Sequence, residues 1–273
     1  MKNCVLFFLF FNIQLLYAQS FVDRDENWKI DLAKSDEFES DEIDQSKWGF
    51  ELWFECTREV VLKAENVQAS DGMLKISVKD EMVNIDHNTK QCKRQKYAKT
   101  SGALISKFEI GGDSYIEIRA KLVDYRADLT SAIWLSDEPV EANNPNLEID
   151  ILETLKAKKK PKQFSSAYHI WNNNDDFPEE NHHLNLDSKK TRLKTKIGED
   201  FHVFGVERRK NYIAMYIDGK LYWKRNMLDH PEFLTQERRL IINVEGHFGT
   251  EEPGDYNKEL LVDYVRVYNY ESE

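Results

Sequence analysis

The chain has 273 residues, with 49 Asp and Glu against 38 Lys and Arg, so its formal net charge is −11. A chain of this length with 12% aromatic residues can bury a substantial core, which excludes a disordered protein. Its 11 Gly and 6 Pro exclude a collagen-like fibre. Since an acidic body repels phosphate, nucleic-acid binding is not an expected task.

The first residues have the features of a secretory signal. Lys2 precedes an apolar run from Val5 to Leu16, and Ala18 is the small residue expected before a cleavage site. We therefore expect residues 1–18 to be removed and residues 19–273 to form one domain that is secreted, periplasmic or at the cell surface. An uncleaved anchor is the alternative. No later segment is long and apolar enough for a membrane span, so no membrane partner is expected.

Two cysteines, Cys56 and Cys92, remain after that cleavage. In an oxidising compartment they predict one disulfide, with two reduced thiols as the alternative. No CxxC or HxxxH spacing accompanies them, so they do not predict a metal site.

Short alternating segments separated by turns predict β-strands along most of the chain. The pairs Asp71-Gly72 and Asp218-Gly219 predict tight turns, the second of them within a hairpin. Helical periodicity is scarce, so the pattern predicts an all-β fold, a sandwich or jelly roll of two antiparallel sheets. The clearest predicted strands cover residues 73–78, 115–122, 212–217, 220–223 and 260–268.

Two groups of basic residues contrast with the acidic background. We interpret each first as a solvated loop or face, with an anion-contacting rim as the functional alternative. The first group is Lys156, Lys158, Lys159, Lys160 and Lys162, and the second is Lys189, Lys190, Arg192, Lys194 and Lys196.

Three carboxylates lie within residues 147–153. Glu148 and Asp150 alternate with isoleucines, so a strand would place both acids on one face. Regular alternation would turn Glu153 away, whereas a β-bulge between Asp150 and Glu153 would return it to the same face.

Carboxylates that share a sheet face repel one another and push at least one pKa upward. Cleavage of a glycosidic bond uses such a difference, because it needs one ionised carboxylate and one protonated acid beside the bond. The pattern therefore indicates a sugar-cleaving site in which Asp150 hydrogen-bonds the nucleophile. A solvated strand edge is the structural alternative.

The segment Glu148-Ile149-Asp150-Ile151-Leu152-Glu153 resembles the signature of glycoside hydrolase family 16 in its β-bulge form. Further segments resemble the family in the same order, and together they span Asp36 to Tyr268, nearly the whole mature chain. They include Asp36-Glu37-Phe38, Thr100-Ser101-Gly102, residues 115–122, Ser131-Ala132-Ile133-Trp134-Leu135, and residues 262–268.

This resemblance implies a β-jelly roll whose concave sheet forms a sugar cleft. It also implies endo-acting, retaining hydrolysis of a β-linked polysaccharide. By position, Glu148 resembles the nucleophile, Asp150 its electrostatic helper and Glu153 the acid/base.

Four further positions resemble substrate-binding positions of the family. Trp134 is expected to stack on a sugar, with core packing as the alternative, and His169 to lie beside the catalytic strand. Trp53 and Arg58 fall in an early loop that often lines the cleft. Each of these residues has a purely structural alternative.

No cofactor is expected to be required, and the protein is expected to be a monomer. Some family members hold calcium on the convex side. The matching positions here are the Asp263 side chain and the Gly72 carbonyl, and such hard oxygen ligands suit calcium.

The substrate expectation rests on departures from the family's β-glucanase pattern. Asn143-Asn144-Pro145-Asn146-Leu147 replaces a usual WPxxGE run, and Thr130-Ser131 replaces a Trp-Pro pair. These features resemble agarases, porphyranases and carrageenases, and the lysines after Glu153 could contact sulfate. We expect a red-algal galactan as substrate, with an endo-β-1,3(4)-glucan of the laminarin type as the alternative. A non-catalytic sugar-binding jelly roll and a transglycosylase on the same fold are the competing classes.

Overall fold

The computed structural model describes residues 25–85, 92, 94–137, 146–171, 183–246 and 255–271. These residues form strands joined by turns, with one short helix, α1 (Glu232–Thr235), and the 3₁₀ turns η2 (Ala64–Asn66) and η3 (Tyr125–Ala127). The predicted signal segment 1–18 and residues 143–145 lie outside the described residues.

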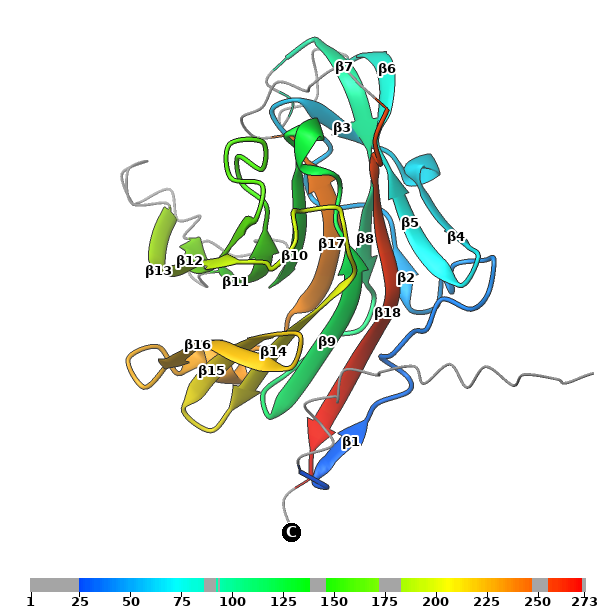
Figure 1. Cartoon of the computed structure of the whole chain (residues 1–273). Helices are drawn as coiled ribbons and strands as arrows, with labels where there is room; N and C mark the ends of the chain where they lie inside the picture. Colours follow the sequence, from blue (N-terminus) through cyan, green and yellow to red (C-terminus); the bar gives the residue numbers. More distant parts are fainter. Residues whose placement is uncertain are drawn as a thin grey trace, which may run out of the picture.

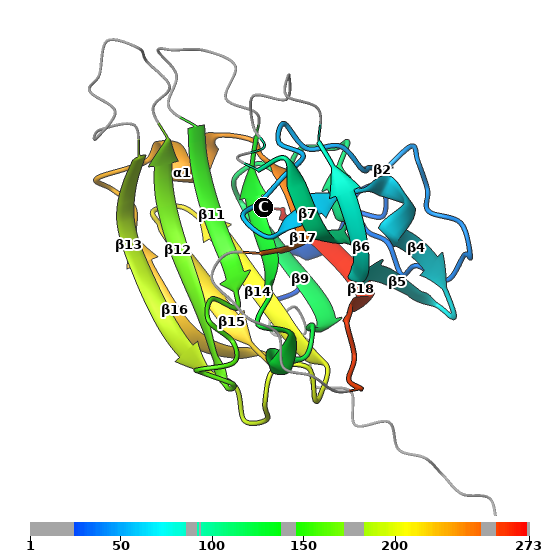
Figure 2. The same ribbon diagram turned by 90° about the horizontal axis from the view of Figure 1, so that it is seen from above.

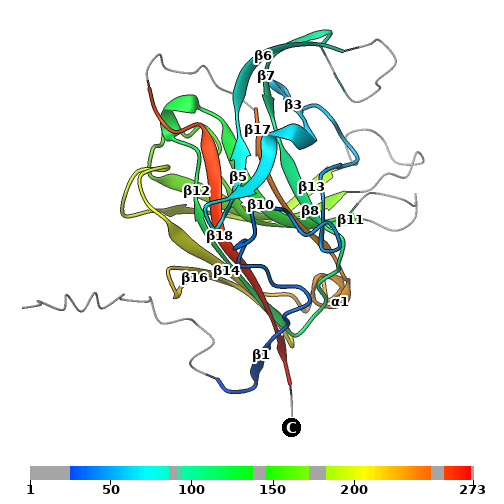
Figure 3. The same ribbon diagram turned by 90° about the vertical axis from the view of Figure 1, so that its right-hand side faces the viewer.

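Two large sheets pack face to face, and neighbouring strands within each sheet run antiparallel (Figure 1). In spatial order the first sheet contains β16 (Lys220–Asn226), β15 (Tyr212–Ile217), β14 (His202–Arg209), β9 (Ser114–Lys121), β18 (Glu259–Tyr270), β5 (Met73–Ser77) and β4 (Val67–Ser70). Its eighth strand, β1 (Trp28–Ile30), pairs with the end of β18 (Figure 3).

The second sheet has seven strands. In spatial order they are β13 (His183–Arg192), β12 (Gln163–Trp171), β11 (Asn146–Glu153), β10 (Thr130–Ser136), β17 (Arg239–Glu245), β8 (Ala103–Ser106) and β2 (Trp48–Gly49). Figure 2 shows β11, β12 and β13 side by side, with β14, β15 and β16 behind them.

A small third sheet stands at one end of the molecule (Figure 1). It contains β3 (Val60–Leu62), β7 (Lys96–Ser101) and β6 (Lys79–Asn84). Cys56 and Cys92 form a disulfide beside this sheet, with their Cα atoms 5.1 Å apart, which confirms the predicted pairing. The bridge joins segments separated by 36 positions and packs against Val61 and Tyr97.

The core lies between the two large sheets because alternate residues of facing strands point inward. Ile116 and Ile118 of β9 and Ile133 and Leu135 of β10 are completely or almost completely buried in this core. The predicted antiparallel sandwich of two sheets is therefore confirmed.

Both predicted Asp-Gly turns join hairpins. Asp71 and Gly72 between β4 and β5 have φ values of 55° and 69°, and Asp218 and Gly219 between β15 and β16 have φ values of 49° and 70°. Two consecutive positive φ angles match the twist of the flanking strands, and Asp-Gly adopts them at low cost. Local turn chemistry thus fixes the register of both hairpins.

Candidate active site

A β-bulge in β11 brings the three acids to one face. Asp150 pairs with Ala167 and Glu153 pairs with Ser165 of β12, so three steps along β11 oppose two steps along β12. The two residues between the acids, Ile151 and Leu152, are both fully buried in the core. The bulge predicted from the sequence is therefore present, and it returns Glu153 to the side of Asp150.

The acids open into a cavity of about 340 Å³ on the side of the seven-stranded sheet that faces away from the core. Glu148 and Glu153 are half-buried and Asp150 is 3% exposed. The described residues lining the cavity are Phe54, Ala132, Trp134, Glu148, Asp150, Glu153, Leu155, His169, Trp171, His183 and Glu245.

Two donors from β12 hold the first two acids. Nε1 of Trp171 donates to Oε2 of Glu148 at 3.0 Å, and Nε2 of His169 lies 3.1 Å from Oδ2 of Asp150. Both contacts are diagonal across the two strands, because Glu148 pairs directly with His169, whereas Trp171 pairs with Asn146 and Asp150 with Ala167. The sheet register thus positions both donors.

Burial raises the pKa of Glu148 well above its usual range, and the neighbouring Asp150 adds to the rise. Burial and then the charge of Glu245 raise the pKa of Asp150 to about 8, against a smaller opposite effect of its hydrogen bond with Glu148. Two carboxyls that share a hydrogen bond in a buried site cannot both ionise easily. At neutral pH we therefore expect the two carboxyls to hold one proton between them rather than to ionise together.

Aromatic side chains form one wall of the cavity. Trp134 is 6% exposed, and its Nε1 donates to Oδ1 of Asn243 at 3.0 Å. Its ring lies 5.6 Å from the ring of Trp53, edge-on, and 6.4 Å from the ring of Phe54, nearly parallel. Trp134 therefore both lines the cavity and packs, and its expected sugar-stacking role stays a prediction.

The remaining two expected cleft residues lie further out. Trp53 contacts Trp134 but is not among the described residues that line the cavity, and Phe54 stands there in its place. Arg58 is exposed in the loop before β3 and does not line the cavity either.

The expected calcium positions are close in the fold but do not fit the ion well. Asp263 lies at a register shift in β18 beside β5, near the turn that contains Gly72. Oδ2 of Asp263 accepts a hydrogen bond from Nη1 of Arg119 at 2.7 Å, so a guanidinium already balances its charge. We assign no role to calcium at these residues.

In the described part of the chain, Glu148, Asp150 and His169 have ligand-type atoms within 4.8 Å of one another. These side chains could approach a common cation. However, His169 contacts Asp150 directly, and Trp171 donates to Glu148. We therefore interpret them as a hydrogen-bonded network rather than as metal ligands.

Sequence reasoning missed several cavity residues, namely Phe54, Leu155, Trp171, His183 and Glu245. Trp171 follows His169 by two positions on the same strand, so alternation alone could have found it. Glu245 and His183 lie on other strands, and only the sheet register brings them to the acids.

A family model described as "Beta-porphyranase A-D, GH16 domain" matches residues 28–270. The kappa-carrageenase of Pseudoalteromonas carrageenovora is 28% identical over 238 residues, which cover 74% of this chain and 54% of that protein. Beta-porphyranase B of Zobellia galactanivorans is 27% identical over 210 residues, covering 73% and 69%. The chain thus spans about half the length of the first relative and about two thirds of the second.

A third curated relative is named for activity on a glucan. Glucan endo-1,3-beta-glucosidase A1 of Niallia circulans is 22% identical over 284 residues, covering 88% of this chain and 38% of that protein.

Among solved structures, porphyranase B from Zobellia galactanivorans has a TM-score of 0.71 at 24% identity, covering 89% of this chain and 92% of that chain. The endo-beta-1,3-glucanase from Pyrococcus furiosus has a TM-score of 0.69 at 23% identity, covering 90% and 96%.

The structural likenesses show the jelly-roll fold, and the family match extends over almost the whole described chain. The chain belongs to glycoside hydrolase family 16, within its β-porphyranase A–D domain group.

Proposed function

We propose that the protein is an endo-acting, retaining glycoside hydrolase that cleaves a β-linked galactan of the red-algal type. The observation that carries the proposal is the bulged strand β11, which directs three carboxyls into one cavity. In this proposal Glu148 is the nucleophile, Asp150 its hydrogen-bond partner and Glu153 the acid/base.

The proposed reaction has two steps. In the first, Glu148 bonds to the anomeric carbon while the bond to the leaving sugar oxygen breaks and Glu153 gives that oxygen a proton. In the second, a water adds to the anomeric carbon, gives a proton to Glu153 and releases Glu148. In the first step the proton that the pair shares lies on Asp150, so that the negative charge is on Glu148, and the Trp171 donor orients that carboxylate.

Charge at one end of the cleft supports an anionic galactan. Side chains of directly paired residues share a sheet face. Glu153 pairs with Ser165, and Ser165 pairs with Lys190, so Lys190 lies two strand spacings, roughly 10 Å, from the proposed acid on the same face. Arg192 pairs with Gln163, the next position on that face. The residue between Glu153 and Lys190 is Ser165, whose side chain is small.

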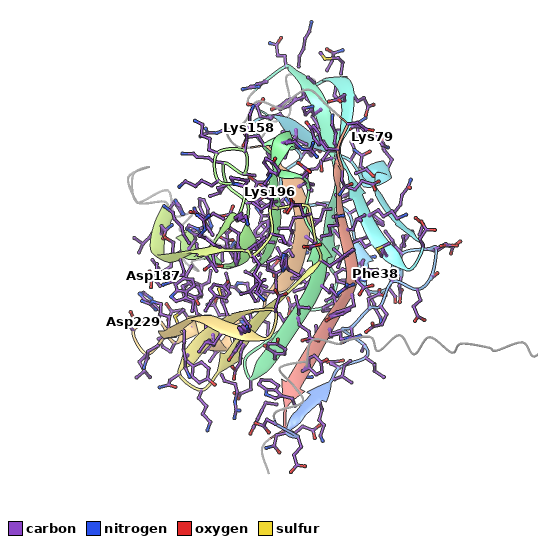
Figure 4. The ribbon with its side chains drawn as sticks, in the orientation of Figure 1. Phe38, Lys79, Lys158, Asp187, Lys196 and Asp229 are labelled. Atoms are coloured by element: carbon purple, nitrogen blue, oxygen red, sulfur yellow. A yellow bond between two sulfur atoms is a disulfide. The ribbon has the colours of Figure 1, made fainter. Side chains whose placement is uncertain are left out.

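Lys190 and Arg192 belong to the second basic group, and the first basic group lies beside them. Nζ of Lys162 donates to the carbonyl of Lys194, which ties the loop after β11 to the end of β13. Figure 4 shows Lys158 and Lys196, one member of each group, on the same side of the molecule. A sulfate on a sugar near Glu153 would meet this cationic rim, which favours a sulfated galactan.

Action outside the cytoplasm is part of the proposal. The Cys56–Cys92 disulfide supports it, because such bridges persist in oxidising compartments. Among the described residues no helix combines the length and apolar character that crossing a membrane requires.

Reducing-end assays on agar, porphyran, κ-carrageenan and laminarin would test the substrate. We expect hydrolysis of a galactan with a mixture of medium-sized products, as endo cleavage gives. Early ¹H NMR spectra should show the β-anomer first, because double displacement retains configuration. The α-anomer appearing first would exclude the proposed mechanism, and products longer than the starting oligosaccharide would indicate a transglycosylase.

The cationic rim is tested with a Lys190→Gln, Arg192→Gln double variant. On a sulfated galactan we expect KM to rise about tenfold, and on the same galactan after chemical desulfation we expect no change. An equal loss on both polymers would mean that these side chains do not read sulfate.

A β-1,3-glucan is the second candidate. The likeness to the Niallia circulans glucosidase favours it. Activity on laminarin alone would select this candidate and remove the galactan proposal.

A further inference from the structure

His183, at the start of edge strand β13, contacts both side chains that hold the first two acids. Its Nε2 lies 2.8 Å from Nδ1 of His169. Its ring stacks on Trp171 with centroids 3.9 Å apart and planes inclined by 16°. His169 then reaches Asp150, and Trp171 reaches Glu148.

Sheet register explains how a residue fourteen positions from His169 arrives there. His183 pairs with Trp171, and a register shift between Tyr168 and His169 places Asn185 opposite His169. His183 therefore lies diagonally from His169 on the cavity face, and it lines the cavity itself. The described groups facing the two histidines are Asp150, Glu148 and Trp171.

We propose that His183 is a positioning residue that fixes His169 on Asp150 and Trp171 on Glu148. The proposal rests on the proposed function for its kinetic consequences and on geometry alone for its structural ones. His183 does not touch the reacting atoms in this proposal and acts through its two neighbours.

The hydrogen bond between the two rings constrains their protons. Of two imidazole nitrogens 2.8 Å apart, one must carry a hydrogen and the other a lone pair. If Asp150 donates its proton to Glu148, its Oδ2 is an acceptor, so Nε2 of His169 must carry a hydrogen. Nδ1 of His169 then either accepts from His183, when His169 is neutral, or donates to His183, when His169 is a cation.

A neutral imidazole at position 183 can complement either form, because its Nε2 donates in one tautomer and accepts in the other. Burial, followed by the charge of His169, lowers the pKa of His183, so His183 stays neutral and keeps this capacity at neutral pH. A side chain that only donates, or that makes no hydrogen bond, would leave His169 free to rotate or to change tautomer.

Two substitutions separate the two contacts. His183→Phe keeps an aromatic ring for stacking on Trp171 but removes the hydrogen bond to His169. His183→Gln keeps an amide that can donate or accept but removes the ring. Leu184→Ala is the matched control, since Leu184 is the next residue on the same edge strand and is 52% exposed.

We expect His183→Phe to lower kcat about tenfold with little change in KM, the effect of losing one hydrogen bond that positions His169. The acid limb of its kcat/KM profile should move to higher pH, because His169 is no longer held against Asp150 and the carboxyl pair loses a contact that favours its ionised form. His183→Gln should keep the acid limb in place, and Leu184→Ala should behave like the parent protein.

A second readout does not depend on activity. Ring ¹⁵N chemical shifts of His169, measured by NMR in the folded protein at pH 7, report which nitrogen carries hydrogen. We expect a Nε2-protonated ring in the parent protein and in His183→Gln, and a changed or averaged tautomer in His183→Phe. An unchanged His169 tautomer and an unmoved acid limb in His183→Phe would overturn the proposal. If no polysaccharide is cleaved, the proposed function fails while the NMR result still decides the role of His183.

Discussion

Glu207 on β14 and Asp150 on β11 are each 3% exposed, yet their surroundings differ. Glu207 belongs to a cluster on the outer face of the eight-stranded sheet, which we call the outer acid cluster: Tyr115, Glu117, Glu207, Tyr212 and Tyr216. The two carboxylate oxygens of Glu207 accept hydrogen bonds from the hydroxyls of Tyr212 and Tyr216, each at 2.7 Å. Asp150 instead faces Glu148 and Glu245, which are acids themselves.

The difference shows what distinguishes a candidate catalytic carboxylate from a structural one. Glu207 has two hydroxyl donors, one for each of its carboxylate oxygens, so its hydrogen-bonding capacity is met by groups that are not acids. Neighbouring acids make Asp150 and Glu148 compete for one proton, so that one carboxyl of the pair can be ionised while the other stays neutral; in the proposed reaction the ionised one is Glu148, and Glu153 is the separate proton donor. Burial of an acid is therefore less informative than the chemistry of its nearest neighbours.

The strongest test of this comparison is Glu148→Gln. We expect hydrolysis to fall by about ten-thousandfold or more, because an amide cannot form the covalent intermediate. Thermal stability should stay the same or rise, since the substitution removes a carboxylate whose charged form is disfavoured by burial. Undiminished hydrolysis, measured from reducing ends, would show that another group is the nucleophile.

The next effect comes from Asp150→Asn. We expect kcat to fall about a hundredfold, since the amide changes the hydrogen bond that supports Glu148. Stability should respond to pH as well. The pKa of Asp150 is raised from its ordinary value of 3.8 to about 8 in the folded chain. Between about pH 4 and pH 8, Asp150 is therefore protonated in the folded state and ionised in the unfolded state.

Because the pKa of Asp150 is higher in the folded than in the unfolded state, its contribution to stability falls as the pH rises. The stabilising contribution of the Asp150 proton is complete below about pH 4 and is lost as the pH rises through about 8. Melting temperatures of the parent protein should therefore fall between pH 5 and pH 8 more steeply than those of Asp150→Asn. Parallel curves would mean that the folded protein does not hold a proton on Asp150 above the ordinary pKa of an aspartate, and the proposed proton sharing with Glu148 would be wrong.

A smaller effect is expected for Trp171→Phe. Phenylalanine can still stack on His183 but has no N–H to donate to Oε2 of Glu148. We expect kcat/KM to fall about tenfold with a normal melting temperature. Unchanged kcat/KM would mean that Glu148 is oriented by Asp150 alone.

Local sequence patterns predicted the parts of this comparison that depend on neighbouring residues. Alternation predicted the strand at 212–217 with its observed bounds, and the Asp-Gly turns and the bulge after Asp150 were also predicted. The bulge could be recognised because Ile151 and Leu152 are consecutive apolar residues; if both point into the core, Glu153 returns to the face that carries Asp150.

Contacts between distant strands could not be predicted from local sequence patterns. His183 reaches the cavity through a register shift between β12 and β13. The side chain of Arg119 in β9 donates a hydrogen bond to Asp263, which lies at a second register shift in β18. Sequence spacing does not determine such registers, because they depend on how whole strands pack. The tyrosine partners of Glu207 were missed for a related reason, although Tyr212 and Tyr216 had been placed in the correct strand.

The smallest expected effect on activity belongs to Glu207→Leu. This change removes the acceptor of two tyrosine hydroxyls on the outer face, so the free energy of unfolding should fall by about 2–4 kcal/mol and the melting temperature by roughly 10 °C. Glu207→Gln should lose less, because its carbonyl still accepts one of the two bonds. At 25 °C both folded variants should hydrolyse the substrate at the parent rate, since Glu207 lies on the outer sheet and Asp150 lines the cavity on the other. A large loss of kcat in correctly folded Glu207→Leu would mean that the two buried acids are coupled through the core, and the distinction between hydroxyl-bound and acid-facing carboxylates would then fail.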